Sequence, residues 1–278
     1  MLNVIKTQRQ TAAEWLDELL THVQQIQKTQ LFAMIDLAQD QHFILQTIQY
    51  HSAAPSYRLL LENTIHHMAA EAGPVLIAFQ TTQEKQVKLL LELIQLIKDE
   101  PRLILFLAEE HVNLDQLAKR LTQAMQVELN EGIMPMIFRF YDPRCIHIAL
   151  SNLSPAEFKF IFEPIHAVHW QDRDGVSCRI NRPDELSSLP DWPHQVLHLS
   201  DGSVQALSAW QQAERWQQTH ESTPDSFGLD NKESMMKLLY KMQLLADEKN
   251  MLSEPERNAF IHEQLQNTSK TNNHIKSN

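Results

Sequence analysis

The chain has 278 residues, of which 43% are apolar and 21% charged, a composition typical of a soluble globular protein with one large or two small domains. Its net charge of −11 at pH 7 argues against nucleic acid and against an anionic membrane surface as partners, because both would need a concentrated basic face. Two cysteines without metal-ligand spacing, an N-terminus without an apolar leader and no apolar run near the roughly 20 residues of a membrane span predict a reduced, cytoplasmic protein.

The N-terminal half of the chain alternates between amphipathic and continuously apolar segments. Thr11 and Glu14 form a capping box at the start of a predicted helix, whose apolar side chains repeat at helical spacing from Trp15 to Ile26. Short apolar runs predict buried strands, and leucine-rich segments between them predict helices. The predicted strands are Leu31–Ile35, Val75–Phe79 and Leu103–Leu107, and the predicted helices are Phe43–Ile48, Gln83–Lys98 and Asn113–Met125. The segment Pro55–Thr64 fits either a strand or a helical turn.

The middle of the chain continues this alternation. Ser154, Pro155 and Glu157 predict a helix start, because serine accepts backbone N–H groups there and proline tolerates the first helical position. Asp174-Gly175 predicts a tight turn between two strands. The strands predicted in this region are Met134–Tyr141, His166–Trp170 and a hairpin return over Val176–Ile180.

The fold class predicted from this order is α/β, with a mixed, mostly parallel sheet covered by helices and followed by a smaller all-helical C-terminal lobe. Continuously apolar strands indicate that both faces of the sheet are covered. Pro183, Pro190, Pro193 and Ser187-Ser188 mark a connection, and the pattern after it is helical. The expected division is an α/β domain over 1–181, a connection over 182–202, a helical lobe over 203–266 and a disordered tail over 267–278.

The stretch Phe138-Arg139-Phe140-Tyr141-Asp142-Pro143-Arg144 follows a predicted strand and precedes a predicted helix. Asp142 is expected to be the N-cap of that helix and Pro143 its first residue. Arg139 is expected to pair with a nearby carboxylate. In a structural interpretation, which the spacing favours, the two arginines tie this turn to neighbouring loops. In a functional interpretation, the same residues form a binding or catalytic constellation.

Recognisable catalytic motifs are absent from the sequence. The histidine pairs lack the spacing of a metal site, and no nucleophile elbow or phosphate loop is present, so neither a metal nor another cofactor is expected. Asp36, Arg139, Asp142 and Arg144 leave open an enzyme that handles phosphoesters at strand ends. Trp210 and Trp216 fit either the core of the helical lobe or anchors for a partner.

Several segments, taken in order, resemble one bacterial family. They are Leu31–Ala38, Leu60–Thr64, Ala72–Leu76, Phe138–Arg144 and Phe162–Ile165 with Trp170 and Asp174-Gly175. Over about residues 30–175 the chain resembles the effector chaperones, or adaptors, of the type VI secretion system, long catalogued as a domain of unknown function. The block Phe138–Arg144 is the most specific part of the resemblance. This chain has Phe162-Glu163-Pro164 where the family usually shows Phe-Gly-Pro.

The resemblance implies a protein that is not an enzyme. Such adaptors bind a cognate effector toxin in the cytoplasm and help to load it onto the VgrG spike protein, sometimes with a PAAR tip. The positions that carry over from the family are Asp36, Arg139, Tyr141, Asp142, Pro143 and Arg144. Partner-specific contacts are expected in the helical lobe, outside the resemblance.

Overall fold

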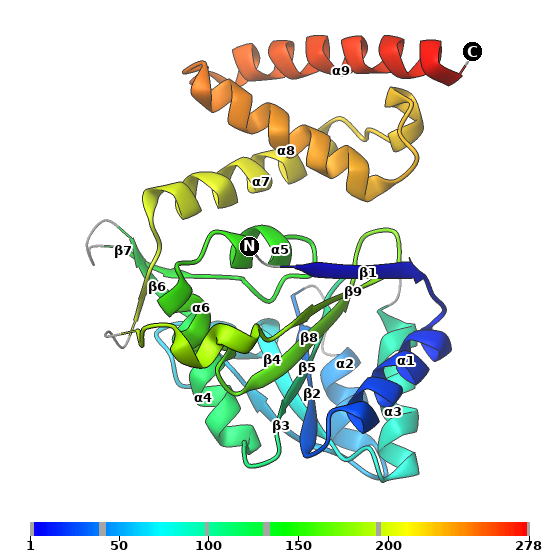
Figure 1. The fold of residues 1–278 in the computed structure, drawn as a ribbon, viewed down its shortest axis with the longest axis vertical. Helices are drawn as coiled ribbons and strands as arrows, with labels where there is room; N and C mark the ends of the chain where they lie inside the picture. Colours follow the sequence, from blue (N-terminus) through cyan, green and yellow to red (C-terminus); the bar gives the residue numbers. More distant parts are fainter. Residues whose placement is uncertain (1–2, 39–42, 98–99, 130–133, 193–195, 277–278) are drawn as a thin grey trace. The chain divides into compact units, whose positions relative to one another are not determined.

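A computed structural model describes residues 3–38, 43–97, 100–129, 134–192 and 196–276 of the chain (Figure 1). The chain divides into two compact units, Met1–Leu199 (unit 1) and Ser200–Asn278 (unit 2). Each unit has its own architecture.

Unit 1 is built on a seven-stranded sheet in which every pair of neighbouring strands is antiparallel. The strand order is β1-β9-β8-β5-β2-β4-β3. The strands are β1 (Val4–Arg9), β2 (Thr29–Asp36), β3 (Ser56–Leu59), β4 (Pro74–Phe79), β5 (Leu103–Glu109), β8 (Ile165–Gln171) and β9 (Val176–Asn181).

The prediction of a mostly parallel sheet is wrong. β4 and β5 run in the same direction, as expected for strands joined through a helix, but β2 lies between them and is antiparallel to both. The crossover through that helix therefore skips one strand. The apolar pattern of a strand reports that both its faces are buried, and it does not report which strand lies beside it.

Helices cover both faces of this sheet, as the sequence indicates (Figure 1). On one face, alternate strand residues such as Leu31, Ala33 and Ile35 pack with the apolar sides of three helices in one core cluster. These helices are α1 (Ala12–Gln25), α2 (Phe43–Tyr50) and α3 (Glu84–Leu96). The other face is covered by α4 (Leu114–Met125) and α6 (Pro155–Phe162), which contact β3, β4 and β8. The helix starts predicted at Thr11 and Ser154 carry capping boxes in α1 and α6, and α4 has one as well, between Asn113 and Gln116.

A second, three-stranded sheet in unit 1 has the order β10-β6-β7, with β10 (Leu197–His198) parallel to β6 (Gln126–Leu129) and β7 (Met134–Ile137) antiparallel to it. Because of this pairing, the end of the predicted connection is part of unit 1. The 3-10 helix η2 (Asp184–Ser188) precedes it, and the Lys159 ammonium donates to the carbonyl of Leu189 at 2.9 Å and pairs with Asp191 at 2.7 Å. Pro193 lies outside the described residues.

The structure differs from the predicted strands in three respects. The strand expected over Met134–Tyr141 ends at Ile137, so the residues that follow form a loop. β1 and β6 are not predicted, because their sequences are short and largely polar. The open segment Pro55–Thr64 contains β3, which is followed by turns and the 3-10 helix η1 (His67–Ala72).

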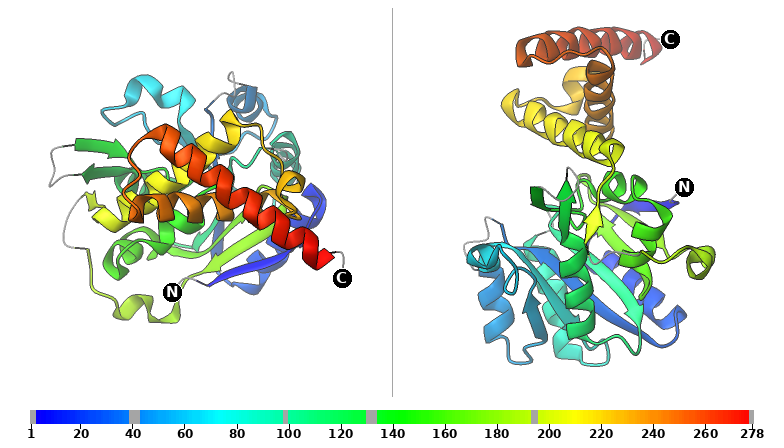
Figure 2. Two further views of the ribbon diagram at one scale, coloured as in Figure 1. Left: turned by 90° about the horizontal axis from the view of Figure 1, so that it is seen from above. Right: turned by 90° about the vertical axis from the view of Figure 1, so that its left-hand side faces the viewer.

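Unit 2 consists of helices in its described part (Figure 2). They are α7 (Asp201–Thr219), η3 (Pro224–Phe227), α8 (Lys232–Glu248) and α9 (Glu254–Lys276). α8 contacts both α7 and α9, and it contributes the buried side chains of Met235, Leu239 and Met242. α9 continues through most of the segment for which a disordered tail is predicted. Of the helices described in the two units, none has the length and apolar character needed to cross a membrane.

Candidate functional site

Asp36 lies at the end of β2, where the central sheet meets a loop from the middle of the chain. Its side chain is buried, and its backbone N–H donates to the carbonyl of Arg102 at 3.0 Å, next to the start of β5. The N–H of Leu37 donates to the carbonyl of Gly73 at 3.2 Å, next to the start of β4. Two strand starts therefore hold the backbone of Asp36 in place.

The loop Phe138–Cys145 is anchored by its aromatic side chains. Phe138, Phe140 and Tyr141 are all buried, and the rings of Phe140 and Tyr141 meet edge to face with their centroids 6.0 Å apart. Arg139 lies between the two buried phenylalanines in sequence but is itself 46% exposed, with its guanidinium 5.9 Å from the centroid of the Tyr141 ring.

Asp142 is not the N-cap of the following helix, contrary to the prediction. That helix, α5 (Ile146–Ser151), has Cys145 at its N-cap position. The Asp142 carboxylate instead accepts the backbone N–H of Arg144 at 3.0 Å, and the Asp142 carbonyl accepts the N–H groups of Cys145 and Ile146 at 3.0 and 2.9 Å. Asp142 thus closes a turn that leads into α5, because its side chain bonds the backbone two residues on. Pro143, in this turn, is buried.

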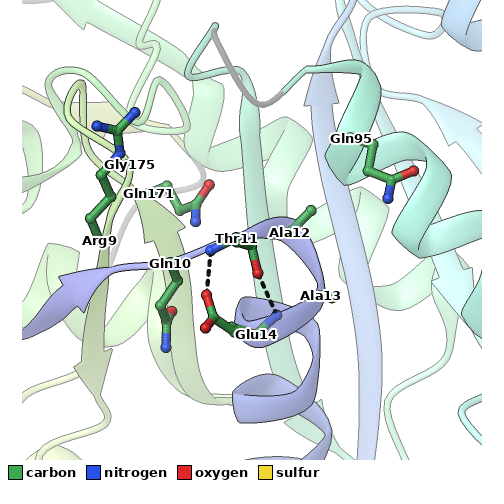
Figure 3. Close-up of a pocket in the computed structure, with 9 residues that line it drawn as sticks. All are labelled: Arg9, Gln10, Thr11, Ala12, Ala13, Glu14, Gln95, Gln171 and Gly175. Carbon is green, nitrogen blue, oxygen red and sulfur yellow. Dashed lines mark hydrogen bonds between the residues drawn. The ribbon is translucent and has the colours of Figure 1, made fainter.

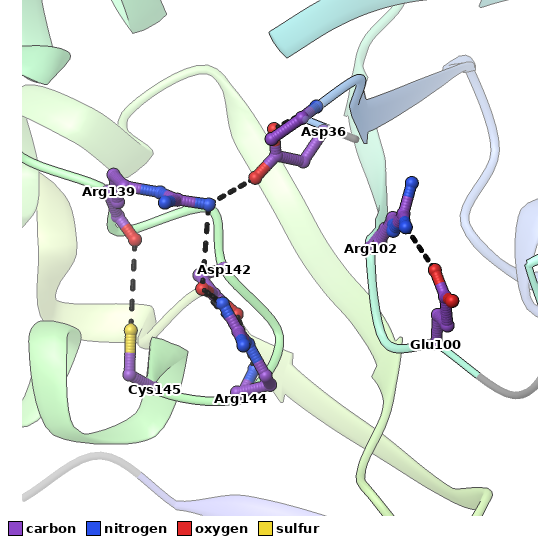
Figure 4. A network of polar contacts seen from close by, with 8 residues as sticks. Asp36, Glu100, Arg102, Arg139, Asp142, Arg144 and Cys145 are labelled. Carbon is purple, nitrogen blue, oxygen red and sulfur yellow. Dashed lines mark hydrogen bonds and ion pairs between the residues drawn. The ribbon is translucent and has the colours of Figure 1, made fainter. Parts of the chain in front are cut away.

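The carboxylates of Asp36 and Asp142 are joined through arginines (Figure 4). The Nη2 atom of Arg139 donates to Oδ2 of Asp36 and lies 3.8 Å from Oδ2 of Asp142. Arg144 binds Asp142 in a fork, with its Nε 2.9 Å from Oδ1 and its Nη2 2.6 Å from Oδ2. The predicted ion pair between Arg139 and a nearby carboxylate is confirmed, and we call Asp36, Arg139, Asp142 and Arg144 the Asp–Arg cluster.

The arginines set the charge state of this cluster. Burial disfavours an ionised Asp142, but hydrogen bonds from the Arg144 guanidinium and backbone hold the pKa of Asp142 below its ordinary value. Burial and the nearby Asp36 raise the pKa of Tyr141. Burial, with Asp142, raises the pKa of the Cys145 thiol to about 12, so this thiol stays protonated and is a poor nucleophile. The cluster therefore holds an ionised Asp142, and both of its carboxylates accept hydrogen bonds from arginines.

The hydrogen-bonding capacity of the Asp36 carboxylate is used within the protein. Oδ1 of Asp36 accepts the N–H of Ala38 at 3.0 Å and Oδ2 accepts Arg139, so this carboxylate is occupied at both oxygens. In the part of the chain that the structure describes, no group of three or more His, Cys, Asp or Glu side chains lies together as a metal site would require. The face of the cluster left open is the half-exposed guanidinium of Arg139.

The two tryptophans of interest lie in α7. Trp210 is buried against Tyr240, with ring centroids 5.5 Å apart. Trp216 is also buried, stacked on His220 at 4.2 Å and in edge contact with His262 at 5.3 Å. Both residues therefore have packing partners within unit 2.

A separate hollow of about 560 Å³ lies at the start of α1 (Figure 3). Arg9, Gln171 and Gln95 line it together with the first turn of α1. The helix start is already closed by the capping box, in which the Thr11 N–H donates to the Glu14 carboxylate at 2.7 Å. None of the residues of the Asp–Arg cluster lines this hollow.

One family model matches part of the chain. Residues 31–159 match the model of a family described as a domain of unknown function, DUF4123. The DUF4123 segment runs from β2 into α6 and contains every residue of the Asp–Arg cluster, whereas unit 2 lies outside it. No curated protein and no solved structure matches the chain.

The structure adds residues around the cluster that the sequence pattern does not indicate. Arg102 pairs with Glu100 beside Asp36 (Figure 4), and Nη1 of Arg173 donates to the carbonyl of Arg144 at 3.3 Å. Glu100 and Arg102 precede β5, and Arg173 lies in the loop between β8 and β9, so all three are far from Arg139 in sequence. Only Gly73-Pro74 gives a local signal, since it predicts a chain break next to Asp36.

Proposed function

We propose that this chain is an adaptor of the type VI secretion system, which binds a cognate effector toxin and promotes its loading onto the VgrG spike or a PAAR tip. The observation that carries the proposal is the DUF4123 match, which contains the complete Asp–Arg cluster. Together with the resemblance of Phe138–Arg144 to the adaptor family, it makes binding of another folded chain the best-supported activity.

The geometry of the cluster supports binding rather than chemistry. Both of its carboxylates accept hydrogen bonds from arginines, and the neighbouring thiol of Cys145 is held protonated. What it offers to a partner is a fixed loop with a half-exposed arginine, and arginine is enriched among the residues that dominate binding energy. We expect no cofactor to be required, and we place the encounter with the toxin in the cytoplasm.

Co-expression tests the proposal directly. The chain carrying an affinity tag is expressed with the toxin and with the VgrG protein encoded beside its gene, first pairwise and then all together. The toxin is expected to co-purify with the tagged chain, and VgrG to join when the toxin is present. A VgrG protein from an unrelated cluster is the matched control. Purification of the chain with neither partner, in every combination, would contradict the adaptor function.

An enzymatic role of the Asp–Arg cluster predicts a different result. The purified chain would then hydrolyse generic phosphoesters, and the rate would fall in Asp36→Asn while the melting temperature of the variant stayed close to that of the wild type. We expect no turnover above that of the buffer. Turnover that depends on Asp36 would replace the adaptor proposal by a phosphoesterase.

A further inference from the structure

Unit 2 carries a hollow of about 280 Å³ that the Asp–Arg cluster does not explain. Its first wall is one face of α7, with Arg215, Trp216 and His220 at helical spacing. Its second wall is the start of α9 and the turn before it, with Leu252, Glu254 and Arg257. We call this hollow the α7 groove.

The second wall of the α7 groove is held by Arg257. The Nε atom of Arg257 donates to the carbonyl of Met251 at 2.7 Å, and Nη1 donates to the side-chain oxygens of Gln212 and Gln243 at 2.6 and 3.0 Å. Nη2 pairs with Asp247. A guanidinium with this many partners joins α7, α8 and α9, so the groove is preformed and its shape does not have to be created by a ligand.

The first wall contains a donor without an acceptor. The Trp216 side chain is 4% exposed, and its Nε1–H has no hydrogen-bond partner among the described residues. A buried polar group left unpaired is costly, and a buried indole N–H is usually paired. His220 stacks on the same ring but uses its Nδ1 on the carbonyl of Trp216 at 2.9 Å, so it does not supply the missing acceptor.

The rim of the groove carries two charged side chains without ion-pair partners among the described residues and one exposed apolar side chain. Arg215 and Glu254 stand on opposite walls, both exposed, and neither has an ion-pair partner among the described residues. Leu252 is 87% exposed, which is unusual for a large apolar side chain beside a concave surface. A carboxylate that enters the groove is attracted towards α7 and repelled from the start of α9.

We propose that the α7 groove binds a peptide segment of the secreted effector in which an apolar side chain stands next to a carboxylate. The apolar side chain covers Leu252, and the carboxylate pairs with Arg215, beside the Trp216 ring that lines the first wall. The inference rests on the proposed function, because it names the contact through which the adaptor would hold its cargo. Unit 2 lies outside the DUF4123 segment, and a surface that differs between adaptors with different cargo is expected there.

The test uses the full chain and overlapping 20-residue peptides that tile the toxin encoded beside its gene. Affinities for the toxin and for each labelled peptide are measured by fluorescence anisotropy. Arg215→Glu and Leu252→Ser are each expected to weaken binding about tenfold, because each removes a contact that the proposal assigns to the bound segment. The matched controls are Lys241→Glu, an exposed charge reversal on α8, and Met68→Ser, a 90% exposed residue of unit 1. Both controls should bind as the wild type does, and all four variants should unfold at the same temperature.

A charge swap makes the assignment specific. In the peptide that binds most tightly, replacing its acidic residue by lysine should weaken binding to the wild type and restore binding to Arg215→Glu. If the wild type and both groove variants bind the toxin equally, the groove inference is overturned while the adaptor function stands. If the groove variants alter only self-association of the chain in sedimentation, the groove is a contact between copies and the inference is overturned. If the wild type binds neither the toxin nor VgrG, the adaptor function fails and the groove inference fails with it.

Discussion

Asp142 is a buried carboxylate whose arginine partners outweigh its burial and hold its pKa below the ordinary value. Asp142 is 7% exposed, and the fork from Arg144 together with the nearer arm of Arg139 replaces the water that a free carboxylate would bind. About a third to a half of the side chains of Arg139 and Arg144 is exposed to solvent, which screens these pairs in part. If these ion pairs are broken, the buried carboxylate of Asp142 is left without solvation, whereas the two arginines can still reach water.

Replacement of Asp142 by asparagine is expected to lower the free energy of unfolding by about 1–3 kcal/mol, since it removes a hydrogen-bonding partner of two charged groups. Because the folded-state pKa of Asp142 lies below its ordinary value, this contribution is present above about pH 3.9 and is lost as the pH falls through the folded-state pKa. Urea titrations at pH 7 measure the difference. Asp115→Asn, at an acid 70% exposed and paired with Arg58 on the surface, should change stability by less than about 0.5 kcal/mol. Equal effects of the two variants would contradict this assignment.

A second residue-scale feature lies in the core of unit 1. The Nδ1 atom of His22 in α1 lies 2.8 Å from Nε2 of His169 in β8, and one proton must be shared between these atoms. Burial, together with His22 and Arg179, lowers the pKa of His169 to about 3. Burial and Arg179 also lower the pKa of His22, against a smaller opposing effect of Glu18. The folded chain therefore resists protonation at a place where the unfolded chain accepts it.

Stability is expected to fall with acidification in a defined window. Unfolded histidines take up protons near pH 6.5, so below that pH the unfolded state binds more protons than the folded state. Above about pH 6.5, the contribution of this histidine pair to the free energy of unfolding should not depend on pH. It should decrease from pH 6.5 towards pH 3, by up to about 1.4 kcal/mol per pH unit for each histidine that stays neutral.

Unfolding measured at pH 7.5, 6.5 and 5.5 checks this expectation. His169→Gln should give a shallower dependence on pH than the wild type, whatever its stability at pH 7.5. The control His67→Gln removes an exposed histidine and should keep the slope of the wild type. An unchanged slope in His169→Gln would show that the pair does not cause the acid sensitivity.

At the scale of elements, the sequence predicts segments whose cause is local. The capping boxes at Thr11, Asn113 and Ser154 fix three helix starts, because the residues that satisfy each other are three positions apart. β2, β4 and β5 are also predicted correctly, because each is a run of consecutive apolar residues. β1 and β6 are not visible, because polar strands are selected by their neighbours' backbone groups, which lie far away in the sequence.

The candidate site also combines features that the local sequence predicts with features that depend on the fold. Burial of Phe138 and Phe140 and the ion-pair requirement of Arg139 follow from residue type and alternation. The choice of Asp36 as partner does not, since it depends on β2 ending opposite this loop. The α7 groove depends equally on the packing of three helices, and the sequence marks only Trp216.

The junction between η1 and β4 provides a test of an element boundary. A Cβ atom at Gly73 would lie 2.6 Å from Cδ1 of Leu61 and 3.2 Å from the backbone carbonyl of Ala69. Leu61 is 4% exposed and has little room to move, so Gly73→Ala is expected to lower the free energy of unfolding by about 1–3 kcal/mol. Because the Gly73 carbonyl accepts the N–H of Leu37, the variant should also disturb the end of β2.

Thermal unfolding of Gly73→Ala and Gly202→Ala measures this effect against a matched control. Gly202 is in α7, and a Cβ atom there would meet only Ser200 Oγ at 3.9 Å. An alanine at this position should be neutral or should stabilise the helix. A Gly73→Ala variant that unfolds at the temperature of the wild type would contradict the close approach to Leu61.

At the scale of the whole molecule, the boundary between the units falls inside the predicted connection of residues 182–202, near its end. Prolines and serines place a connection from residue 182, but η2, the contact of Lys159 with Asp191 and the pairing of β10 with β6 belong to unit 1. A high content of proline and serine predicts irregular backbone. It does not indicate whether the irregular segment packs on the preceding domain.

Two truncations test this boundary. A chain of residues 1–199 is expected to fold and remain soluble, since it contains all of unit 1. A chain of residues 1–181 should be less stable in urea and more sensitive to proteolysis, because β6 loses its parallel neighbour and Lys159 loses its partners. By the groove inference, residues 1–199 should not capture the toxin. Equal stability of the two chains would contradict the assignment of residues 182–199 to unit 1, and toxin capture by residues 1–199 would contradict the role of unit 2.

The placement of Asp36 on β2 restricts how relatives of this chain can vary in length. β2 has hydrogen-bonded neighbours on both sides and buried side chains on both faces, and Asp36 reaches Arg139 only from its present side of the strand. Loss or gain of one residue between Thr29 and Ile35 would turn Asp36 to the opposite face and exchange every inward side chain of the strand with its neighbour. Among related sequences, insertions and deletions should therefore gather in the loops on either side, and the spacing from the start of this strand to the aspartate should stay constant.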